Sequence, residues 1–455
     1  MTEAPAQLGD LIGPVIRDLA RRSHHDITRW LHQVDRLRGC TDPIRLTGES
    51  TTLNATTGEL LHTYTTRDEP HGQLLIRCGN RRASRCPACA ETYRQDTFHL
   101  IRAGLLGGDK GVPEIVRTHP RVLATLTAPS FGPVHRGPGK DGTLNVCHPR
   151  RTGPSCFTRH QKGDPTIGQP LDPDTYDHTG HVLWNAHAAA LWHRFTIYLR
   201  QHLAAATGLT RKEFARTTHL SFAKVAEYQA RGVVHFHAII RLDGRDGDTL
   251  TSPPAWATLD LLTTAITSAA KAVRLPAPET GQPLTWGTID VRPIQSAGLD
   301  ADALSEAAVA GYIAKYATKA AETSGTLDRR VTRQDLARLH THGVTEHAAR
   351  LIRTAWDLGN TDAHPDLAQL RLRQWAHMLG FRGHFSTKSR AYSTTLTALR
   401  RVRLEYREAQ ELQRLRHDPT STLVLAHWKY AGQGFTPGES ALAATINDHN
   451  PAGGN

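Results

Sequence analysis

The stretch "RGVVHFHAIIRL", residues 231–242, carries two histidines one residue apart within an apolar run. Together with the apolar segment before it, this stretch predicts two strands joined by a tight turn at Ala230–Gly232. Side chains alternate between the two faces of a strand, so His235 and His237 point the same way. If the turn centres on its middle residue, Glu227 lies opposite His235, and directly opposed residues share a face. The hairpin therefore predicts one surface with two imidazoles and a carboxylate.

These three side chains suit a divalent cation. Two histidines and one acid leave positions open for a phosphate oxygen and water, so we expect Mg²⁺ or Mn²⁺ at His235, His237 and Glu227. The third ligand depends on the inferred centre of the turn. A His-x-His pair taken alone is equally consistent with two unrelated histidines.

A second pattern lies in "GYIAKYATKA", residues 311–320, which predicts part of a helix. Tyr312 and Tyr316 are four residues apart, about 40° around a helix, so both hydroxyls project from one face. Lys315 and Lys319 share the adjoining face. The alternative interpretation is that both tyrosine rings pack in the core with their hydroxyls at its edge.

The two patterns together indicate a chemistry. A tyrosine is a weak nucleophile near neutral pH because its pKa is about 10. A lysine and a metal-bound phosphate beside it ease the loss of its proton and stabilise the charge that develops on phosphorus. We therefore expect an enzyme that breaks DNA by transesterification, with two tyrosines allowing two successive strand transfers.

The six cysteines are too few and too unevenly spaced for a disulfide framework in a chain of this length. Three of them, Cys78, Cys86 and Cys89, lie close together around a Cys-Pro-Ala-Cys turn. With Cys40 as the fourth ligand they predict a structural Zn²⁺ site. A redox Cys-x-x-Cys pair is the alternative, but no βαβ pattern surrounds it.

A further group of possible metal ligands lies downstream. Cys147 and Cys156, with His148 and His160 nearby, form a second candidate metal site. Ordinary loop residues are an equally good interpretation of the same four side chains.

Composition favours a polyanionic partner. The 455 residues are 39% hydrophobic and 22% charged, which is typical of a soluble globular protein. The net charge of +12 and the pI of about 9.6 favour nucleic acid over an anionic membrane as partner. The sequence has no apolar run of transmembrane length, and "MTEAPAQLGDLIG" lacks the features of a signal peptide. We expect a cytoplasmic protein that does not bind membranes.

The pattern of elements predicts three parts. These are a helical, Cys-rich zinc-binding region over 1–118, a core over 119–325 with an irregular insertion at 131–180, and a basic helical DNA-binding region over 326–455 that ends in a disordered tail. Within the core, strands are predicted at 119–131 and 285–295, and helices at 181–208, 254–273 and 300–323.

The C-terminal part carries candidate DNA contacts. Residues 381–416 hold nine Lys or Arg and three acidic residues. We expect Ser386, Lys388 and Arg390 to contact phosphates and Tyr392 to stack on a base. An exposed basic helix without a ligand is the alternative interpretation.

A possible helix-turn-helix precedes these contacts. Residues 331–356 predict two helices around Gly343, with Thr345 as the N-cap of the second. A plain helical hairpin fits the same pattern equally well.

Three of these segments occur in an order that resembles a known superfamily. "LATLTAPS" (123–130), "HFHAII" (235–240) and "YIAKYATK" (312–319) are similar to the threonine-rich strand, the His-hydrophobe-His motif and the tyrosine helix of HUH endonucleases. Longer blocks, such as "CGNRRASRCPACA" and "GHFSTKSRAYSTTLTALR", resemble the replication initiators of actinomycete rolling-circle plasmids. The resemblance extends from about Cys40 to Arg403.

This resemblance implies an α+β fold with an HUH-type central antiparallel sheet, similar to an RRM, an N-terminal zinc module and a C-terminal helical region. It also implies that the protein nicks one strand at the double-strand origin, stays linked to the 5′ phosphate through tyrosine, and later rejoins the displaced strand. Tyr316 matches the position of the nucleophile in single-tyrosine initiators, so we expect it to act before Tyr312. Asp172 and Thr175 stand where relatives carry cysteines, which argues against the second metal site.

The sequence also indicates which partners the protein needs and which other functions remain possible. "GPGKDG" (137–142) does not fit the phosphate-binding loop of ATPases, so we do not expect the protein to unwind DNA itself. We expect a host helicase, a host DNA polymerase and a host single-strand-binding protein to act with it on single-stranded or hairpin plasmid origin DNA. Two alternatives stay open, namely an HUH transposase or conjugative relaxase, and a non-catalytic zinc-containing DNA-binding regulator. A covalent tyrosine–DNA adduct separates the regulator from the enzymes.

Overall fold

The computed structural model describes eight stretches of the chain, which are 24–108, 111–139, 141–277, 281–294, 305–318, 325–401, 404 and 422–449. The chain forms two compact units, one comprising Met1–Asp96 with Thr395–Asn455 and the other Thr97–Thr394. Within these stretches, no helix combines the length and the apolar character needed to cross a bilayer.

The second unit is built on a six-stranded sheet with the strand order β8-β4-β6-β5-β9, and β7 pairs with the far end of β6. All of the pairings are antiparallel. The strands are β4 (Arg121–Leu126), β5 (Thr218–Tyr228), β6 (Val234–Asp246), β7 (Thr249–Thr251), β8 (Ile289–Pro293) and β9 (Ser386–Lys388). The predicted central antiparallel sheet is therefore present, with the histidine strand β6 in its middle.

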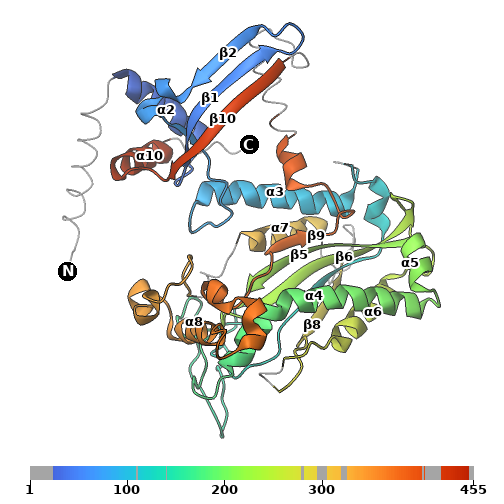
Figure 1. Ribbon diagram of the computed structural model, residues 1–455. Coiled ribbons are helices and arrows are strands. Elements are labelled where there is room, and N and C mark those ends of the chain that lie inside the picture. The colour runs from blue at the N-terminus through green and yellow to red at the C-terminus, as the bar shows by residue number, and fades with distance from the viewer. Residues whose placement is uncertain are drawn as a thin grey trace. The chain divides into compact units, whose positions relative to one another are not determined.

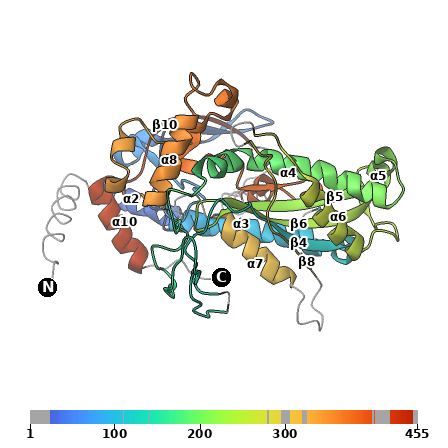
Figure 2. The same cartoon turned by 90° about the horizontal axis from the view of Figure 1, so that it is seen from below.

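Helices lie on both faces of this sheet (Figures 1 and 2). α4 (His178–Ala206) and α6 (Leu259–Ala272) lie on one face and α7 (Glu306–Ala317) on the other. α5 (Arg211–Thr217) and α8 (Glu346–Leu358) pack beside α4. Trp192 of α4 packs its ring against Phe236 of β6, at 5.9 Å between centroids. On the other face, Tyr312 of α7 packs against His237, at 4.9 Å. The alternation of side chains along β6 thus separates an apolar face under α4 from a polar face under α7.

The predicted insertion is irregular in the structure as well. Between β4 and α4, the described residues form no helix and only isolated bridges, such as Val134↔Pro170 and His148↔Cys156. α4 then begins at His178, where the Asp177 side chain accepts a hydrogen bond from the Gly180 N–H.

The region after α7 is less helical than predicted. α8 is the one α-helix in the described residues 325–394, which otherwise form short 3₁₀ turns and β9. Gly343 adopts φ +72° and Thr345 caps α8, as predicted. The segment before Gly343, however, contains only the turns Asp335–Ala337 and His340–His342. Both the helix-turn-helix and the helical-hairpin predictions are therefore wrong, because the first helix does not form.

The first unit is built from segments near both ends of the chain. Its sheet has the order β10-β1-β2, and β3 also pairs with β1. Its elements are α2 (His24–Leu37), β1 (Ile44–Asn54), β2 (Leu60–Thr65), β3 (Leu74–Ile76), β10 (Thr422–Gln433) and α10 (Pro437–His449). α3 (Pro87–Leu106) crosses from the first unit into the second. The predicted disordered end of the tail, NPAGGN, lies outside the described residues.

This grouping differs from the three-part division that the sequence suggests. β1 pairs along its whole length with β10, from Ile44↔Gln433 to Asn54↔Thr422. Residues 326–394, by contrast, belong to the unit that carries the histidine strand. The physical reason is that strands close a sheet through hydrogen bonds between segments that are far apart in sequence.

Packing of α3 in the second unit generates a stability prediction. The Gly104 Cα lies against the buried Tyr392 ring, so a methyl group at residue 104 would overlap that ring. We expect Gly104→Ala to lower the free energy of unfolding by roughly 1–3 kcal/mol. Gly311→Ala is the matched control, because it is also a helical glycine but has open space around it, and it should stabilise α7 by about 1 kcal/mol. Equal thermal midpoints for the two variants would contradict this packing.

Candidate active site and metal centres

The β5–β6 hairpin brings the three predicted ligands together. Glu227 pairs with His235 across the hairpin, as predicted from the centre of the turn. The Glu227 Oε2 atom lies 3.0 Å from the His235 Nε2 and 3.2 Å from the His237 Nε2. The three ligand atoms lie within 4.8 Å of one another. They fit one divalent ion with two nitrogen ligands and one oxygen ligand.

The neighbouring strand orients one of these imidazoles. Thr125 of β4 pairs with His237, and its hydroxyl lies 3.0 Å from the His237 Nδ1. A hydrogen bond at Nδ1 turns Nε2 toward the Glu227 carboxylate, and such partners raise the affinity of sites that bind a metal. Thr125 lies within the "LATLTAPS" segment but was not among the predicted site residues.

The turn of the hairpin is held from α4. The side-chain amide of Asn185 donates to the Gly232 carbonyl, and its oxygen accepts from the Val234 N–H, both at 3.0 Å. Asn185 is completely buried. Gly232 adopts φ +83°, which a residue with a side chain rarely does. These bonds fix where β6 begins, and with it the register of the hairpin.

Helix α7 brings both tyrosines to the same cluster. The Tyr312 hydroxyl lies 3.2 Å from the His237 Nε2. The Tyr316 ring stacks along the His237 ring, with centroids 5.3 Å apart and planes at 29°. The two tyrosine rings contact each other at 4.6 Å. The i, i+4 spacing therefore places both tyrosines over the sheet face that carries Glu227 and the two histidines, as predicted.

The first turn of α7 is tied to the sheet. Ser305 caps the helix by accepting from the Ala308 N–H. Glu306 accepts a hydrogen bond from the buried Arg121 guanidinium of β4 at 2.6 Å. A buried, charge-assisted bond of this kind is strong and directional, so it fixes the position of the tyrosines relative to the histidines.

The surroundings of Tyr312 keep its phenol neutral. Burial raises the pKa of Tyr312 above its usual range, and Tyr316 and Glu227 raise that pKa further. Arg292 of β8 acts in the opposite direction and lowers the pKa. A cation bound nearby would counter this rise in pKa by stabilising the phenolate.

The two candidate lysines differ in what the structure describes. Lys315 is exposed, and its ammonium lies 5.9 Å from the centre of the Tyr316 ring. Lys319 lies outside the described residues.

The four predicted zinc ligands also converge, in the first unit. The sulfurs of Cys40, Cys78, Cys86 and Cys89 all lie within 4.8 Å of one another. The Cys78 N–H donates to the Cys40 sulfur at 3.4 Å, and hydrogen bonds from Cys40 and Cys89 lower the pKa of Cys86. The group could hold a tetrahedral metal such as zinc.

The predicted DNA contacts near β9 need correction. Tyr392 is fully buried and its hydroxyl donates to the Ile101 carbonyl at 3.1 Å, so it is not available to stack on a base. Lys388 is half-buried, and its ammonium donates to the Ser393 carbonyl at 2.6 Å. Of the four predicted contacts, Ser386 and Arg390 are exposed. Tyr392 lies in the core because its ring packs directly against Gly104 of α3 and beneath the Arg241 guanidinium.

A third group of convergent ligands lies in the insertion. His135, Cys147, Cys156 and His160 present atoms that lie within 4.8 Å of one another. Cys147, Cys156 and His160 are three of the four predicted ligands, and His135 takes the place predicted for His148. His148 follows Cys147 directly, but His135 lies twelve residues before it, and no spacing rule indicated its approach.

Comparison with known proteins identifies relatives over nearly the whole chain. The family model RepSA, described as "Replication initiator protein, pSAM2", matches residues 26–448. A replication initiator protein of Streptomyces ambofaciens is 52% identical over 453 residues, which cover 97% of this chain and 93% of the relative. No solved structure matches the chain significantly.

The contact between Thr125 and His237 generates a prediction on metal affinity. We expect Thr125→Val to weaken Mn²⁺ binding by roughly 10–100-fold, since His237 loses the bond that orients it. Titration calorimetry on zinc-loaded protein measures this. Thr127→Val is the control, because the Thr127 hydroxyl donates to the Thr288 carbonyl rather than to a site histidine. Equal affinities for the two variants would argue against this role of Thr125.

Proposed function

We propose that this chain, which belongs to the RepSA family of replication initiator proteins, starts plasmid replication by nicking one strand of its origin DNA at the site formed by Glu227, His235, His237, Tyr312 and Tyr316. The products are a tyrosine joined to a 5′ phosphate and a free 3′ hydroxyl. A second transfer at the same site then rejoins the displaced strand.

The observation that carries this proposal is the position of Tyr312. Its hydroxyl lies 3.2 Å from the Nε2 of His237, which is itself 3.2 Å from the Glu227 carboxylate. Packing alone does not require a phenol, two imidazoles and a carboxylate to converge on a sheet face. This combination of a nucleophile with ligands for a divalent ion is what a metal-assisted transesterase needs.

The ligand set fits Mg²⁺ or Mn²⁺. Glu227 Oε2 is shared between the two Nε2 atoms, and Thr125 occupies the other nitrogen of His237. Bound there, a divalent ion would polarise the scissile phosphate and lower the pKa of a nearby phenol.

The residues of this chain perform the following step. The phenolic oxygen of one tyrosine forms a bond to phosphorus as the bond from phosphorus to the 3′ oxygen breaks. The phenol gives up its proton to solvent, and the departing 3′ oxygen gains one. Lys315, next to Tyr316, adds positive charge where the phosphate becomes more negative. The second tyrosine repeats the attack on a new junction while the first holds the 5′ end. The 3′ hydroxyl that this second cleavage releases then attacks the first phosphotyrosine, so that a phosphodiester forms, the bond from phosphorus to the first tyrosine breaks, and its phenol regains a proton.

The order of the tyrosines is part of the proposal. We assign the first attack to Tyr316, on its resemblance to the nucleophile of single-tyrosine initiators. Tyr312, whose hydroxyl contacts His237, is assigned the second transfer.

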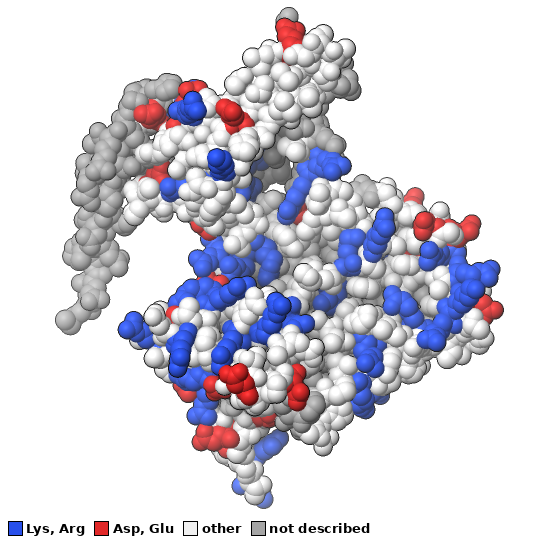
Figure 3. Space-filling model, viewed as in Figure 1, with Lys and Arg blue, Asp and Glu red and all other residues white. Residues whose placement is uncertain are grey.

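Charge supports DNA as the substrate. The chain has a net charge of +12. On the face shown in Figure 3, Lys and Arg side chains are spread widely over the unit that carries the six-stranded sheet, and acidic side chains are fewer there. Such a surface attracts the phosphate backbone without reading sequence. Arg390 and Ser386, both exposed near β9, are proposed as phosphate contacts.

Two further parts of the proposal concern the cysteine group and the host replication proteins. The group of Cys40, Cys78, Cys86 and Cys89 is assigned a structural Zn²⁺. The free 3′ end would serve a host DNA polymerase in the cytoplasm, with a host helicase and single-strand-binding protein acting on the unwound origin.

A nicking assay tests the chemistry. Labelled single-stranded DNA carrying the origin of the encoding plasmid is incubated with Mn²⁺ and separated on a denaturing gel. We expect a covalent protein–DNA band that EDTA abolishes and that Tyr316→Phe reduces at least about a thousandfold. Tyr312→Phe should keep this band but lose strand rejoining.

Tyr430→Phe is the control, because Tyr430 is exposed on β10 in the other unit, and it should react as wild type. Failure of the wild-type chain to form any adduct would favour a non-catalytic DNA-binding regulator. An adduct that forms equally on unrelated hairpins and rejoins them would favour a transposase.

A further inference from the structure

The insertion between β4 and α4 is long and has little regular structure. Its described residues contain isolated bridges but no helix. Loops of this length inside a compact unit are uncommon unless something other than a ladder or a helix holds them. The side chains of Cys147, His148 and His160 are nevertheless buried, so the insertion has a packed centre of its own.

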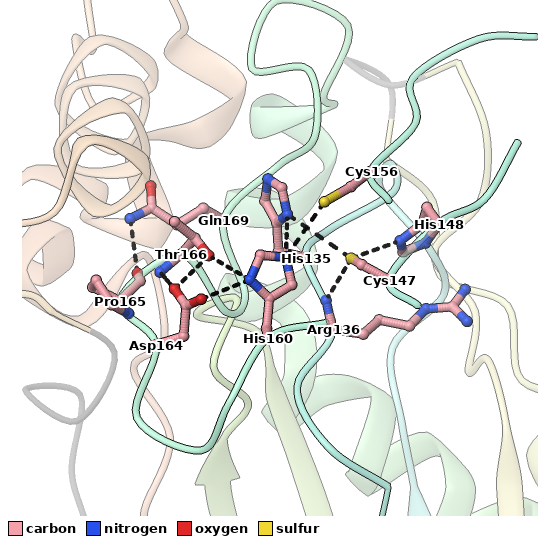
Figure 4. A network of polar contacts seen from close by, with 10 residues as sticks. All are labelled: His135, Arg136, Cys147, His148, Cys156, His160, Asp164, Pro165, Thr166 and Gln169. Carbon is pink, nitrogen blue, oxygen red and sulfur yellow. Dashed lines mark hydrogen bonds and ion pairs between the residues drawn. The ribbon is translucent and has the colours of Figure 1, made fainter. Parts of the chain in front are cut away.

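Four side chains meet at that centre with the spacing of a tetrahedral site. The His135 Nδ1 lies 3.1 Å from the His160 Nε2, the Cys156 Sγ lies 3.4 Å from the same Nε2, and the Cys147 Sγ lies 3.8 Å from the His135 Nδ1. Tetrahedral Zn²⁺ with two sulfurs and two nitrogens separates its ligand atoms by about 3.3–3.8 Å. Figure 4 shows these four side chains pointing at a common centre.

The groups behind the ligands support the same assignment. The Asp164 carboxylate lies 2.7 Å from the His160 Nδ1, so it fixes the tautomer in which Nε2 faces the centre. A carboxylate behind a metal-binding histidine is a common arrangement at zinc sites. The Arg136 N–H donates to the Cys147 sulfur at 3.2 Å, and such bonds stabilise a thiolate.

The backbone brings the two halves of the site together. His148 and Cys156 exchange two hydrogen bonds, from His148 N to Cys156 O at 2.7 Å and from Cys156 N to His148 O at 2.9 Å. The His135 N–H donates to the Gln169 carbonyl at 2.8 Å. His148, which directly follows a ligand, lies 3.2 Å from the Cys147 sulfur but is not one of the four convergent side chains.

We infer that His135, Cys147, Cys156 and His160 form a second structural zinc site, which holds the insertion together. Four protein ligands close the coordination sphere, so this ion has no position for substrate and serves structure rather than catalysis. The inference is independent of the proposed nicking activity.

The site also fixes a basic cavity. His135 and the neighbouring Arg136 line a cavity of about 490 Å³, together with Arg150 and with Arg231 from the β5–β6 turn. Gly168 packs its backbone directly against Ala230 of that turn. An ordered insertion would therefore hold Arg136 and Arg150 beside Arg231, at the turn of the hairpin that carries His235.

Metal analysis of the full chain tests the inference. The protein is loaded with Zn²⁺, desalted and analysed by mass spectrometry for zinc per chain. We expect the Cys147→Ser/Cys156→Ser double variant to bind one equivalent fewer than the wild type, with any Zn²⁺ at Glu227, His235 and His237 common to both. His135→Ala should also lose one equivalent, whereas the matched control His148→Ala should bind as much zinc as the wild type.

A second measurement does not depend on how the insertion variants fold. In the Cys86→Ser/Cys89→Ser variant, which removes the other cysteine group, Co²⁺ should give the absorption of a single tetrahedral site with two thiolates, a spectrum that Glu227, His235 and His237 cannot produce because they include no sulfur. Absence of that spectrum, retention of the wild-type zinc content in the Cys147/Cys156 variant, or a Cys147–Cys156 disulfide in protein isolated without reductant would each overturn the inference.

Discussion

The pairing of Glu227 with His235 across the β5–β6 hairpin is the constraint on which the candidate active site depends. Because side chains alternate along a strand, a slip of one residue would turn Glu227 toward the apolar face under α4 and leave the two imidazoles without a carboxylate. Asn185 opposes such a slip by bonding to both Gly232 and Val234 at the turn. The His347 imidazole of α8, 2.9 Å from the Arg231 carbonyl, holds the turn from a second helix.

The tyrosines depend on a second constraint, the buried bond between Arg121 and Glu306. Arg121 also donates to the Leu105 carbonyl of α3, so one guanidinium joins β4, α3 and α7. Removing one partner of a buried pair leaves an uncompensated charge and typically costs about 3–5 kcal/mol. The site is therefore held by elements that lie far apart in sequence, and its geometry is a property of the whole unit.

Local pattern was sufficient to predict the hairpin, the convergence of Glu227, His235 and His237 on one face, and the shared face of the two tyrosines, since each depends on a period of two or of about four residues. Local pattern was not sufficient where contacts between distant segments determine the position of a side chain or a strand. Tyr392 has the sequence surroundings of a DNA contact, yet it fills the space beside Gly104. His135 joins Cys147 through the path of an irregular loop, which no periodicity encodes. β1 and β10 lie near opposite ends of the chain, and neither segment has a sequence pattern that predicts their pairing.

The most direct test of the account is to locate the divalent ion. Crystals of the zinc-loaded protein soaked in Mn²⁺ would be measured by anomalous diffraction near the manganese edge. The account predicts one manganese peak bounded by Glu227, His235 and His237, next to the Tyr312 hydroxyl. A fully soaked crystal with no peak there, or with manganese bound by other residues, would contradict it.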